Sequence, residues 1–515
     1  MDPLSPLFLV TIATTFFLYL RWRRPNQPPY PPGPRGLPFI GNLLDVVLDK
    51  SCKPQYLKYV DLGRAYNSDV VHIDVCGDHL VVLNSAEAIE ELLEKRSLNY
   101  SDRPPMPMLN DLVGWNEFDI GLMRYSDKWK IHRRIFNQYF KPQVITSYYP
   151  AHRKEVLVFL NDLLNDQENL HAYARSYTGA SILRVVYGIT SEEEKAYFVK
   201  LVDQAMESFI AGANRGSFML DYFPFLKYIP AWVPGAGFKR KAVTWAKYVS
   251  DMNHHPWQNL RSSITNGTIV SSIATDALGN FSEEMEPIIQ HVCAVSYVAG
   301  ADSTVALVLS SILALVRHPE VQKRAQVELD GVVGTKRLPD FQDRENLPYI
   351  DAILQETQRI YPALPLSLDH CSMDDDFYNG YFIPKGTTVI GNAWAVLHDE
   401  SIYPDPMEFK PERFLRQKGR PSPPDSALYA FGFGRRICPG RFFALDAAWL
   451  AVACVLATFD IIKAFDADGE EIEVIAEHTP GAVSHPLPFK CEFVPRSPQA
   501  LDLLQNGFLN SEVAE

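Results

Sequence analysis

The amino-acid sequence predicts a mainly helical protein with small β-sheets, preceded by an N-terminal membrane helix. Three observations support this prediction. Two apolar segments, 288–316 and 442–459, are long enough to form buried helices. Two short segments, 70–75 and 80–83, are rich in β-branched residues, as strands are. An apolar run at the start, 4–20, ends at a cluster of arginines.

The composition is that of a globular protein. The chain has 515 residues, of which 47% are hydrophobic and 22% are charged, and this excludes a disordered or collagen-like chain. The 49 basic and 62 acidic side chains give a formal charge of −13, which argues against a nucleic-acid-binding protein that relies on overall basicity. Length alone suggests roughly three domains, but no repeat or internal linker marks a boundary.

Residues 1–24 are expected to be a membrane anchor. The apolar run would give a helix of about 25 Å, slightly short of a typical hydrocarbon core. Arginines follow it at positions 21, 23 and 24, while only Asp2 precedes it, so the positive-inside rule places the rest of the chain in the cytosol. The alternative is a cleaved secretory signal, but the run lacks a basic start and a small-residue cleavage site.

Residues 25–38 form a Pro-rich hinge, and the body of the protein is expected to follow over residues 39–515. Prolines fix the backbone and stiffen such a segment into an extended spacer, which would hold the body close to the membrane. A ligand for a proline-recognising domain is the alternative interpretation. The seven cysteines form no paired spacing, and this favours a reducing compartment over a disulfide scaffold.

Within the body, segments 70–75 and 80–83 are the first predicted strands. The longest predicted helix, 288–316, lies between Pro287 and Pro319 and would measure about 44 Å. Segment 442–459 could imitate a membrane span, but Asp446 would cost about 2.5–3.5 kcal/mol at a bilayer centre. We therefore predict a buried core helix there.

A glycine-rich segment, 431–440, places Cys438 immediately before that core helix. A helix N-terminus and nearby arginines favour a thiolate, and glycines let backbone amides approach the sulfur. Arg436 could then meet an anionic group of a cofactor. The alternative is an inert buried cysteine, which is the better interpretation for Cys293 and Cys454. No second cysteine or histidine lies near enough to indicate zinc.

This segment resembles the F-x-x-G-x-R-x-C-x-G loop of the cytochrome P450 superfamily. Three further motifs follow the family's pattern: E-x-x-R at Glu356–Arg359, P-E-R-F at Pro411–Phe414, and W-x-x-x-R at Trp129–Arg133. The resemblance runs from the hinge to the C-terminal region and therefore implies the cytochrome P450 fold in a single large catalytic domain, 39–515. Within the family, the sequence looks most like secondary-metabolism monooxygenases of filamentous fungi, and segment 379–387 contributes to that resemblance.

The resemblance implies that the protein binds haem b, with Cys438 as the axial ligand of the iron. It also implies cofactor contacts from Trp129, Arg133, His370 and Arg436. A solvated basic stretch is the alternative for the first two. Around His370 the sequence departs from that of relatives. Glu356 and Arg359 are expected to clamp Arg413, which is a structural role.

The oxygen-activation segment of the family resembles residues 299–304, which predicts Asp302, Ser303 and Thr304 as catalytic residues. An acid next to a hydroxyl can relay protons. Ser303 stands where the family usually has threonine, and its hydroxyl is less restricted. The alternative is an ordinary helix with a locally bonded serine.

The implied reaction is hydroxylation or epoxidation of a hydrophobic small molecule such as a terpenoid, polyketide, steroid or aromatic xenobiotic. The lining of its pocket is expected from segments 103–118, 209–225, 363–368 and 481–483, and from Val295, Ser296 and Ala299.

The chain has no G-x-G-x-x-G segment for its own nicotinamide or flavin domain, so electrons must come from a partner. The family's donor is NADPH–cytochrome P450 reductase, with cytochrome b5 as an optional second partner, at the endoplasmic reticulum membrane. A basic docking face is expected from Lys128, Lys130, Arg134 and Arg435. Two other classes stay open: a haem-thiolate isomerase or dehydratase that needs no external electrons, and a non-catalytic haem sensor.

Overall fold

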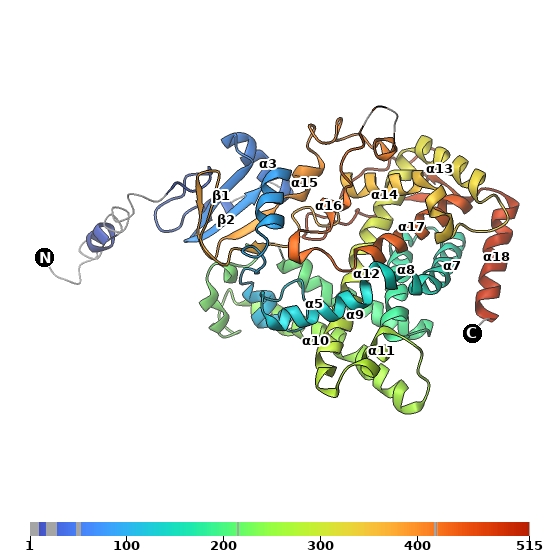
Figure 1. Cartoon of the computed structure of the whole chain (residues 1–515), viewed down its shortest axis with the longest axis horizontal. Coiled ribbons are helices and arrows are strands. Elements are labelled where there is room, and N and C mark those ends of the chain that lie inside the picture. The colour runs from blue at the N-terminus through green and yellow to red at the C-terminus, as the bar shows by residue number, and fades with distance from the viewer. Residues whose placement is uncertain are drawn as a thin grey trace.

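The computed structural model describes residues 10–16, 28–47, 53–213, 216–416, 419 and 421–513. Residues 10–16 are helical, and Val10, Ile12 and Phe16 are exposed on a helix that stands clear of the body (Figure 1). The remainder of the predicted anchor, and the first part of the hinge, lie outside the described residues.

The body is built mainly from helices, as predicted. The larger ones are α3 (Gln55–Tyr66), α5 (Asp127–Phe140), α7 (Tyr149–Asn165), α8 (Leu170–Tyr187), α9 (Glu192–Gly212), α10 (Gly237–Asn266), α11 (Ile273–Asn280), α12 (Glu286–Arg317), α13 (Pro319–Val332), α14 (Pro348–Ile360), α17 (Arg441–Thr458) and α18 (Pro498–Val513). Short helices include α2 (Leu43–Val47), α4 (Ala86–Ile89), α6 (Pro142–Ile145), α15 (Ala393–Leu397) and α16 (Ala427–Ala430). In Figure 1, α12 runs through the middle of this bundle, with α8 and α17 among the helices it packs against.

Both long apolar segments are core helices. The expected helix 288–316 is confirmed as α12, which is slightly longer at each end, and 442–459 is confirmed as α17. In the described residues these two regions are the segments long and apolar enough to cross a membrane, yet most of each lies inside the protein. Asp446 of α17 is paired with Arg344 at 2.7 Å, so its charge has a partner within the fold.

The largest sheet has the strand order β1-β2-β6-β3. Strand β1 (Val70–Val75) has the predicted bounds, and β2 (Asp78–Leu83) begins two residues earlier than predicted. They pair antiparallel, while β2 and β6 (Thr388–Gly391) pair parallel. The other strands are β3 (His370–Cys371), the pair β4 (Asp376–Tyr378) and β5 (Tyr381–Ile383), and the pair β7 (Phe459–Lys463) and β8 (Cys491–Pro495).

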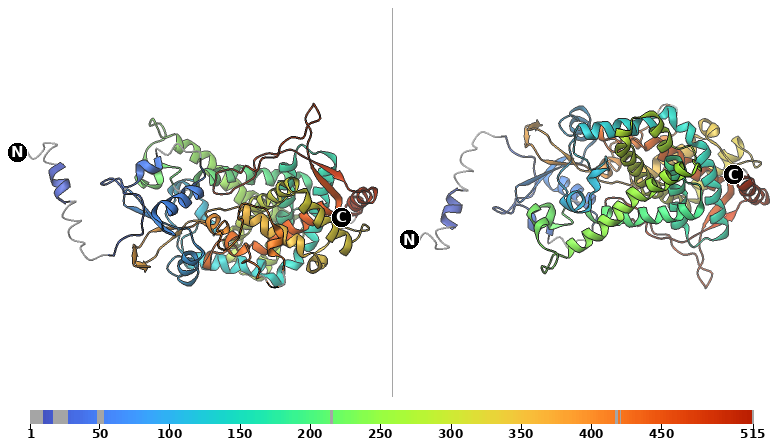
Figure 2. Two further views of the ribbon diagram at one scale, coloured as in Figure 1. Left: turned by 90° about the horizontal axis from the view of Figure 1, so that it is seen from above. Right: turned by 90° about the horizontal axis from the view of Figure 1, so that it is seen from below.

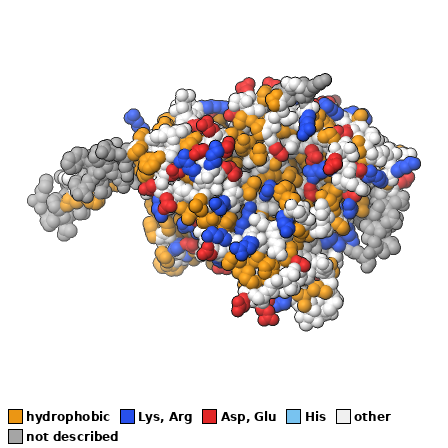
Figure 3. All heavy atoms as spheres, viewed as in Figure 1, with side chains coloured by type: hydrophobic (Ala, Val, Ile, Leu, Met, Phe, Trp, Pro, Cys, Tyr) orange, Lys and Arg blue, Asp and Glu red, His pale blue; other side chains and the backbone are white. Residues whose placement is uncertain are grey.

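The two ends of the body are formed by different secondary-structure elements. The β1–β2 sheet lies at the end from which the N-terminal segment leaves, and β7, β8 and α18 lie at the opposite end (Figure 2). Two large apolar clusters fill the interior between them; one includes the first half of α12 and the other its second half together with α17. On the face drawn in Figure 3, acidic, basic and apolar side chains are interspersed. The candidate active site described below lies along α12, between these two apolar clusters.

Candidate active site

The cysteine loop is shaped by its glycines. Gly432 and Gly434 have φ values of 75° and 55°, a region that favours glycine. A Cβ on Gly434 would lie 2.2 Å from the carbonyl oxygen of Leu93, so no other residue fits there without a shift. The backbone N–H of Cys438 donates to the carbonyl of Phe431 at 2.8 Å, which closes the loop just before α17. The sulfur is thereby presented to the cavity described below.

Burial dominates the environment of the Cys438 thiol and raises its pKa. The backbone N–H groups of Gly440 and Arg441 and the charges of Arg133 and Arg441 act in the opposite direction but do not outweigh burial. The backbone amides and the arginines therefore act in the direction expected from the sequence, while burial of the sulfur opposes them. A coordinated metal ion deprotonates a thiol outright, so a bound iron would add to the groups that favour the thiolate.

Arg436, which is buried, and Arg133, which is partly buried, lie beside this loop, and neither has a carboxylate partner in the described residues. Arg133 donates to the carbonyl of Ile437, and Arg436 donates to three backbone carbonyls, those of Ser101, Ile120 and Met123, at 2.7–3.0 Å. Neither forms an ion pair with an acid in the described part of the chain. Burial lowers the pKa of Arg133 to about 10 and that of Arg436 to about 8. An anion bound here would relieve this cost.

Trp129 and His370, the other two predicted cofactor contacts, both lie near Arg436. The Trp129 indole N–H donates to the carbonyl of Ile120 at 3.0 Å, and the Arg436 guanidinium sits 4.4 Å from the centre of the Trp129 ring. The His370 Nδ1 lies 2.6 Å from the carbonyl oxygen of Tyr100, and burial lowers its pKa well below the usual value. Trp129 is thus a packing partner of Arg436 as well as a candidate cofactor contact.

Sequence reasoning missed the position of Arg103, which was named only as part of a substrate-lining segment. Its side chain is buried and donates to the carbonyls of Gly121, Leu368 and Asp369 at 2.6–2.8 Å. It lines the same cavity as Arg133 and Arg436. No local motif marks Arg103, because its partners lie up to 266 positions away.

The three predicted catalytic residues on α12 have different surroundings. Ser303 donates its hydroxyl to the carbonyl of Ala299 at 2.8 Å, the local bond that the alternative interpretation expected. The Thr304 hydroxyl is buried and has no hydrogen-bond partner in the described residues. Asp302 lies 3.0 Å from the Arg175 guanidinium and 3.1 Å from the His485 imidazole. All three residues line the cavity.

The pKa of Asp302 is below its usual value. Burial alone would raise it, but the hydrogen bonds and charges of His485 and Arg175 outweigh burial. Asp302 is therefore a carboxylate engaged with these two groups. Sequence reasoning missed both partners, which lie on α8 and on the loop before β8.

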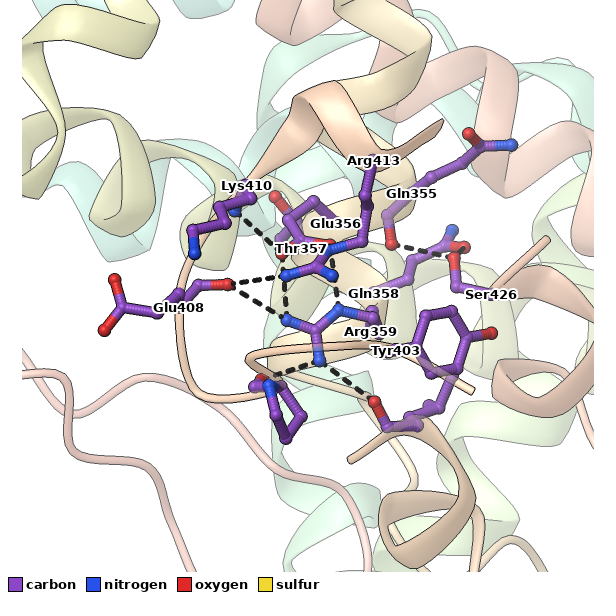
Figure 4. Close-up of polar contacts among 12 residues, drawn as sticks. Gln355, Glu356, Thr357, Gln358, Arg359, Tyr403, Glu408, Lys410, Arg413 and Ser426 are labelled. Atoms are coloured by element: carbon purple, nitrogen blue, oxygen red, sulfur yellow. Dashed lines mark hydrogen bonds and ion pairs between the residues drawn. The ribbon is translucent and has the colours of Figure 1, made fainter. Parts of the chain in front are cut away.

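The E-x-x-R motif forms the predicted clamp (Figure 4). Arg359 binds both carboxylate oxygens of Glu356 at 2.8 Å, and Arg413 binds the same carboxylate at 3.0 Å. Glu356 and Arg359 are completely buried. The remaining guanidinium N–H groups donate to carbonyls of the segment that leads to the cysteine loop, including those of Pro406 and Glu408. The structural role assigned to this motif is confirmed.

One cavity of about 260 Å³ is lined by Cys438, by Arg103, Arg133, His370 and Arg436, and by Asp302, Ser303 and Thr304. Trp129 and the clamp residues Glu356, Arg359 and Arg413 are not among its lining residues. Cys438 and Phe443 lie on one side, and Ala299, Ser303 and Thr304 of α12 on another. The predicted substrate-lining segments contribute apolar side chains to it: Trp115, Phe209, Val295, Ala363, Leu364 and Val483. A smaller adjoining cavity of about 30 Å³ is lined by Met106, Gly481 and Ala482, among others.

The arrangement fits a haem group. Cys438 is the only cysteine in the cavity lining, which agrees with a single axial thiolate ligand. The walls are apolar, as a porphyrin face requires, and uncompensated guanidinium groups lie at one edge, as two propionates require. Within the described residues, no group of three or more histidines, cysteines or acids could hold a metal ion directly.

Comparison with known proteins agrees with this site. The cytochrome P450 family model matches residues 31–493. The chain is 40% identical to a cytochrome P450 monooxygenase of Armillaria gallica, over 98% of this chain and 99% of that protein. It is 39% identical to a cytochrome P450 monooxygenase of Postia placenta, with 95% of each chain covered. It is 36% identical to the tryptamine 4-monooxygenase of Psilocybe cyanescens, over 94% and 96% of the two chains.

The chain therefore belongs to the cytochrome P450 family. It is an enzyme of the monooxygenase class, with the mainly helical fold of the family, and it binds haem b through a cysteine thiolate. The relatives named above are fungal proteins, in agreement with the resemblance identified from the sequence.

Proposed function

We propose that this cytochrome P450 hydroxylates or epoxidises a hydrophobic small molecule, with electrons from an NADPH-dependent reductase. The observation that carries the proposal is the shared cavity: the Cys438 sulfur and the hydroxyl-bearing residues Ser303 and Thr304 line one largely apolar space. Bound haem with a thiolate ligand supplies reductive activation of dioxygen and oxygen insertion into an organic substrate. The protein residues then have three tasks: to hold the cofactor, to exclude water and to supply protons.

The residues proposed to hold the cofactor come from separate parts of the chain. Cys438 is the proposed iron ligand. The residues proposed to bind the propionates are Arg133, Arg436, His370 and Trp129, because the guanidinium groups are buried or partly buried without acidic partners in the described part of the chain. Arg103 is added to this set for the same reason. Its Nη1 already serves two carbonyls, so it would contribute charge more than new hydrogen bonds.

Proton supply is proposed for the hydroxyls of α12. Ser303 is bonded to Ala299, but its hydroxyl can rotate to a new acceptor. Thr304 has a buried hydroxyl without a partner, which is costly unless it serves a ligand or a water molecule. Asp302 would act behind them as a fixed negative charge, since its oxygens are already engaged.

The substrate class follows from the cavity. Its wall is mainly apolar and aromatic, which favours a hydrophobic molecule such as a terpenoid, polyketide, steroid or aromatic compound. The similar tryptamine 4-monooxygenase carries an aromatic substrate in its name, which is compatible with an aromatic ligand here.

The electron donor is proposed to dock on the face that carries Lys128, Lys130, Arg134 and Arg435. All four are exposed. Lys130 pairs with Asp127 at 2.9 Å, so its charge is partly balanced. Arg435 lies within the cysteine loop, three residues before the proposed iron ligand. A basic face near the cofactor suits an acidic redox partner, with cytochrome b5 as a second candidate.

Removal of the α12 hydroxyls is expected to uncouple the reaction. Ser303→Ala should leave the haem-thiolate spectrum intact but lower product formation, with about 10²–10⁴-fold as the upper range for a proton-transfer group. NADPH consumption should continue, with hydrogen peroxide released in place of product. The measurement is the ratio of product to NADPH consumed.

Ser303→Thr is the matched variant, because it keeps the hydroxyl and adds a methyl that restricts its rotamers. It should couple at least as well as the natural residue. If Ser303→Ala and Thr304→Val each leave rate and coupling unchanged, these hydroxyls do not supply the protons. Asp302→Asn should lower coupling less than the loss of Ser303, because Asp302 acts through its charge.

We also propose that residues 1–24 anchor the chain in the endoplasmic reticulum membrane, with residues 25–38 as the hinge and 39–515 as the cytosolic catalytic domain. Deletion of residues 1–24 should therefore release the protein from membranes while haem stays bound, as fractionation and the absorption spectrum would show. The chain has glycosylation sequons at Asn99, Asn266 and Asn280. Glycan on any of them would contradict a cytosolic body, because the transferase acts in the lumen.

A further inference from the structure

The loop 477–487 closes one side of the substrate cavity. Its two arms are paired through the backbone: Leu487 N–H donates to the carbonyl of Glu477 at 2.8 Å, and Thr479 N–H donates to that of His485 at 2.8 Å. At the tip, Val483 lines the main cavity, while Pro480, Gly481 and Ala482 line the smaller adjoining one. The position of this tip therefore sets part of the shape of the cavity.

His485 ties the loop to α12. Its Nε2 lies 3.1 Å from Oδ2 of Asp302, and both side chains are buried, with relative exposures of 9% and 2%. The Nδ1 of His485 is buried and has no hydrogen-bond partner in the described residues. The contact with Asp302 is thus the polar interaction that orients this ring.

The carboxylate of Asp302 is also linked to a second wall of the cavity, which is formed by α9. The other oxygen of Asp302 accepts from Arg175 of α8 at 3.0 Å, and Arg175 binds Asp203 of α9 at 2.8 Å. Helix α9 contributes Met206 and Phe209 to the cavity. Asp302 therefore connects α12 with both α9 and the loop 477–487.

The base of the loop has its own attachment. His478 Nε2 lies 3.3 Å from the Ser310 hydroxyl, two helical turns after Asp302, and its ring stacks on Tyr361 with centroids 4.7 Å apart. Loss of His485 should therefore free the tip of the loop and leave its base in place. The effect would fall on the cavity wall and not on the fold as a whole.

We propose that His485 is a positioning residue for substrate selection, because its hydrogen bond to Asp302 holds the 480–483 tip against the cavity. This inference deepens the proposed function, since it concerns the same cavity. It assigns Asp302 a role besides that of a fixed negative charge behind the α12 hydroxyls: two walls of the cavity are attached to this residue. A wall that is ordered in advance costs a ligand less binding free energy than one that it must order itself.

The test uses the haem-loaded protein and two ligands of the haem iron, imidazole and 4-phenylimidazole. The phenyl group extends into the cavity, whereas imidazole alone is too small to need the wall. His485→Leu should weaken 4-phenylimidazole about tenfold, as expected for loss of a buried hydrogen bond to a charged group, and should leave imidazole within about twofold. His485→Gln places an N–H donor near the position of Nε2 and should restore binding of the larger ligand.

The matched control is His398→Leu, which removes an imidazole packed on Trp394 outside the cavity lining. It should change neither dissociation constant. Hydrogen exchange of the 479–487 amides should rise in His485→Leu and not in His485→Gln.

The proposal would be overturned if the His485→Leu variant bound each of the two ligands as tightly as the natural protein does. It would also be overturned if the leucine and glutamine variants lost affinity for 4-phenylimidazole to the same extent. A leucine variant that no longer binds haem would overturn it too, because the contact would then support the fold. Neither binding nor exchange depends on turnover, so the result stands apart from the test of monooxygenase activity.

Discussion

Cys438→Ala is expected to abolish both the carbon-monoxide spectrum typical of thiolate-ligated haem and all monooxygenase activity. The cavity lining contains no second cysteine, so no other thiolate in that lining can take over as ligand. The measurement is the reduced carbon-monoxide difference spectrum of the purified variant, together with its haem content.

Cys454→Ala is the matched control for this change. Cys454 is also a buried cysteine, but it lies inside α17, is not part of the cavity lining, and its sulfur donates to the carbonyl of Pro339 at 3.7 Å. This variant should keep the thiolate spectrum. A thiolate spectrum retained in Cys438→Ala would show that another residue binds the iron.

Glu356→Ala is expected to lower the free energy of unfolding by about 3–5 kcal/mol, because it leaves two guanidinium groups without their carboxylate. Arg359 is completely buried and Arg413 has a relative exposure of 7%, so water cannot replace the lost partner well. The segment that precedes the cysteine loop loses its attachment at the same time. Urea unfolding and haem retention measure the two effects.

Lys410→Ala is the control in the same segment. Its ammonium pairs with Asp405 at 2.9 Å on the surface, where ion pairs contribute about 0–1 kcal/mol. If Glu356→Ala is no more destabilising than Lys410→Ala, the clamp does not hold this segment together.

The cysteine loop could be predicted from the sequence because its residues are contiguous and each has a distinct chemical reason. The glycines are needed for positive φ values, and the cysteine immediately precedes an apolar helix. For the E-x-x-R clamp, the spacing of Glu356 and Arg359 predicted only a shared helical face, and the contact with Arg413, 57 positions away, was expected from the family resemblance. The core helices could be predicted equally well, because a long apolar segment with few charges has few alternatives to a buried helix in a globular protein.

The surroundings of Asp302 could not be predicted in this way. Its partners, Arg175 and His485, lie 127 and 183 positions away, and neither belongs to a recognisable motif. The sequence therefore suggested an acid next to a hydroxyl, whereas the structure shows a carboxylate bound to an arginine and a histidine. The burial of the Cys438 sulfur, which opposes the expected effect of the arginines and backbone amides, could be evaluated only once the fold was known.

Two other classes of haem-thiolate protein make different demands on the site. An isomerase or dehydratase needs no proton supply for dioxygen and no electron donor. Ser303 and Thr304 beside the cavity, and the basic face that carries Arg435, are unneeded in such an enzyme. A haem sensor needs no cavity for a substrate, whereas this one is lined by apolar groups from α9, α12 and the loop 477–487.

The most direct test of the central claim is oxygen labelling. Hydrophobic compounds that shift the haem spectrum would be incubated with the enzyme, a cytochrome P450 reductase, NADPH and oxygen-18 dioxygen. A monooxygenase should form a product that carries one labelled oxygen atom, and only when NADPH is present. Product formed without NADPH, or product whose new oxygen is unlabelled, would contradict the assignment of this site as a monooxygenase centre.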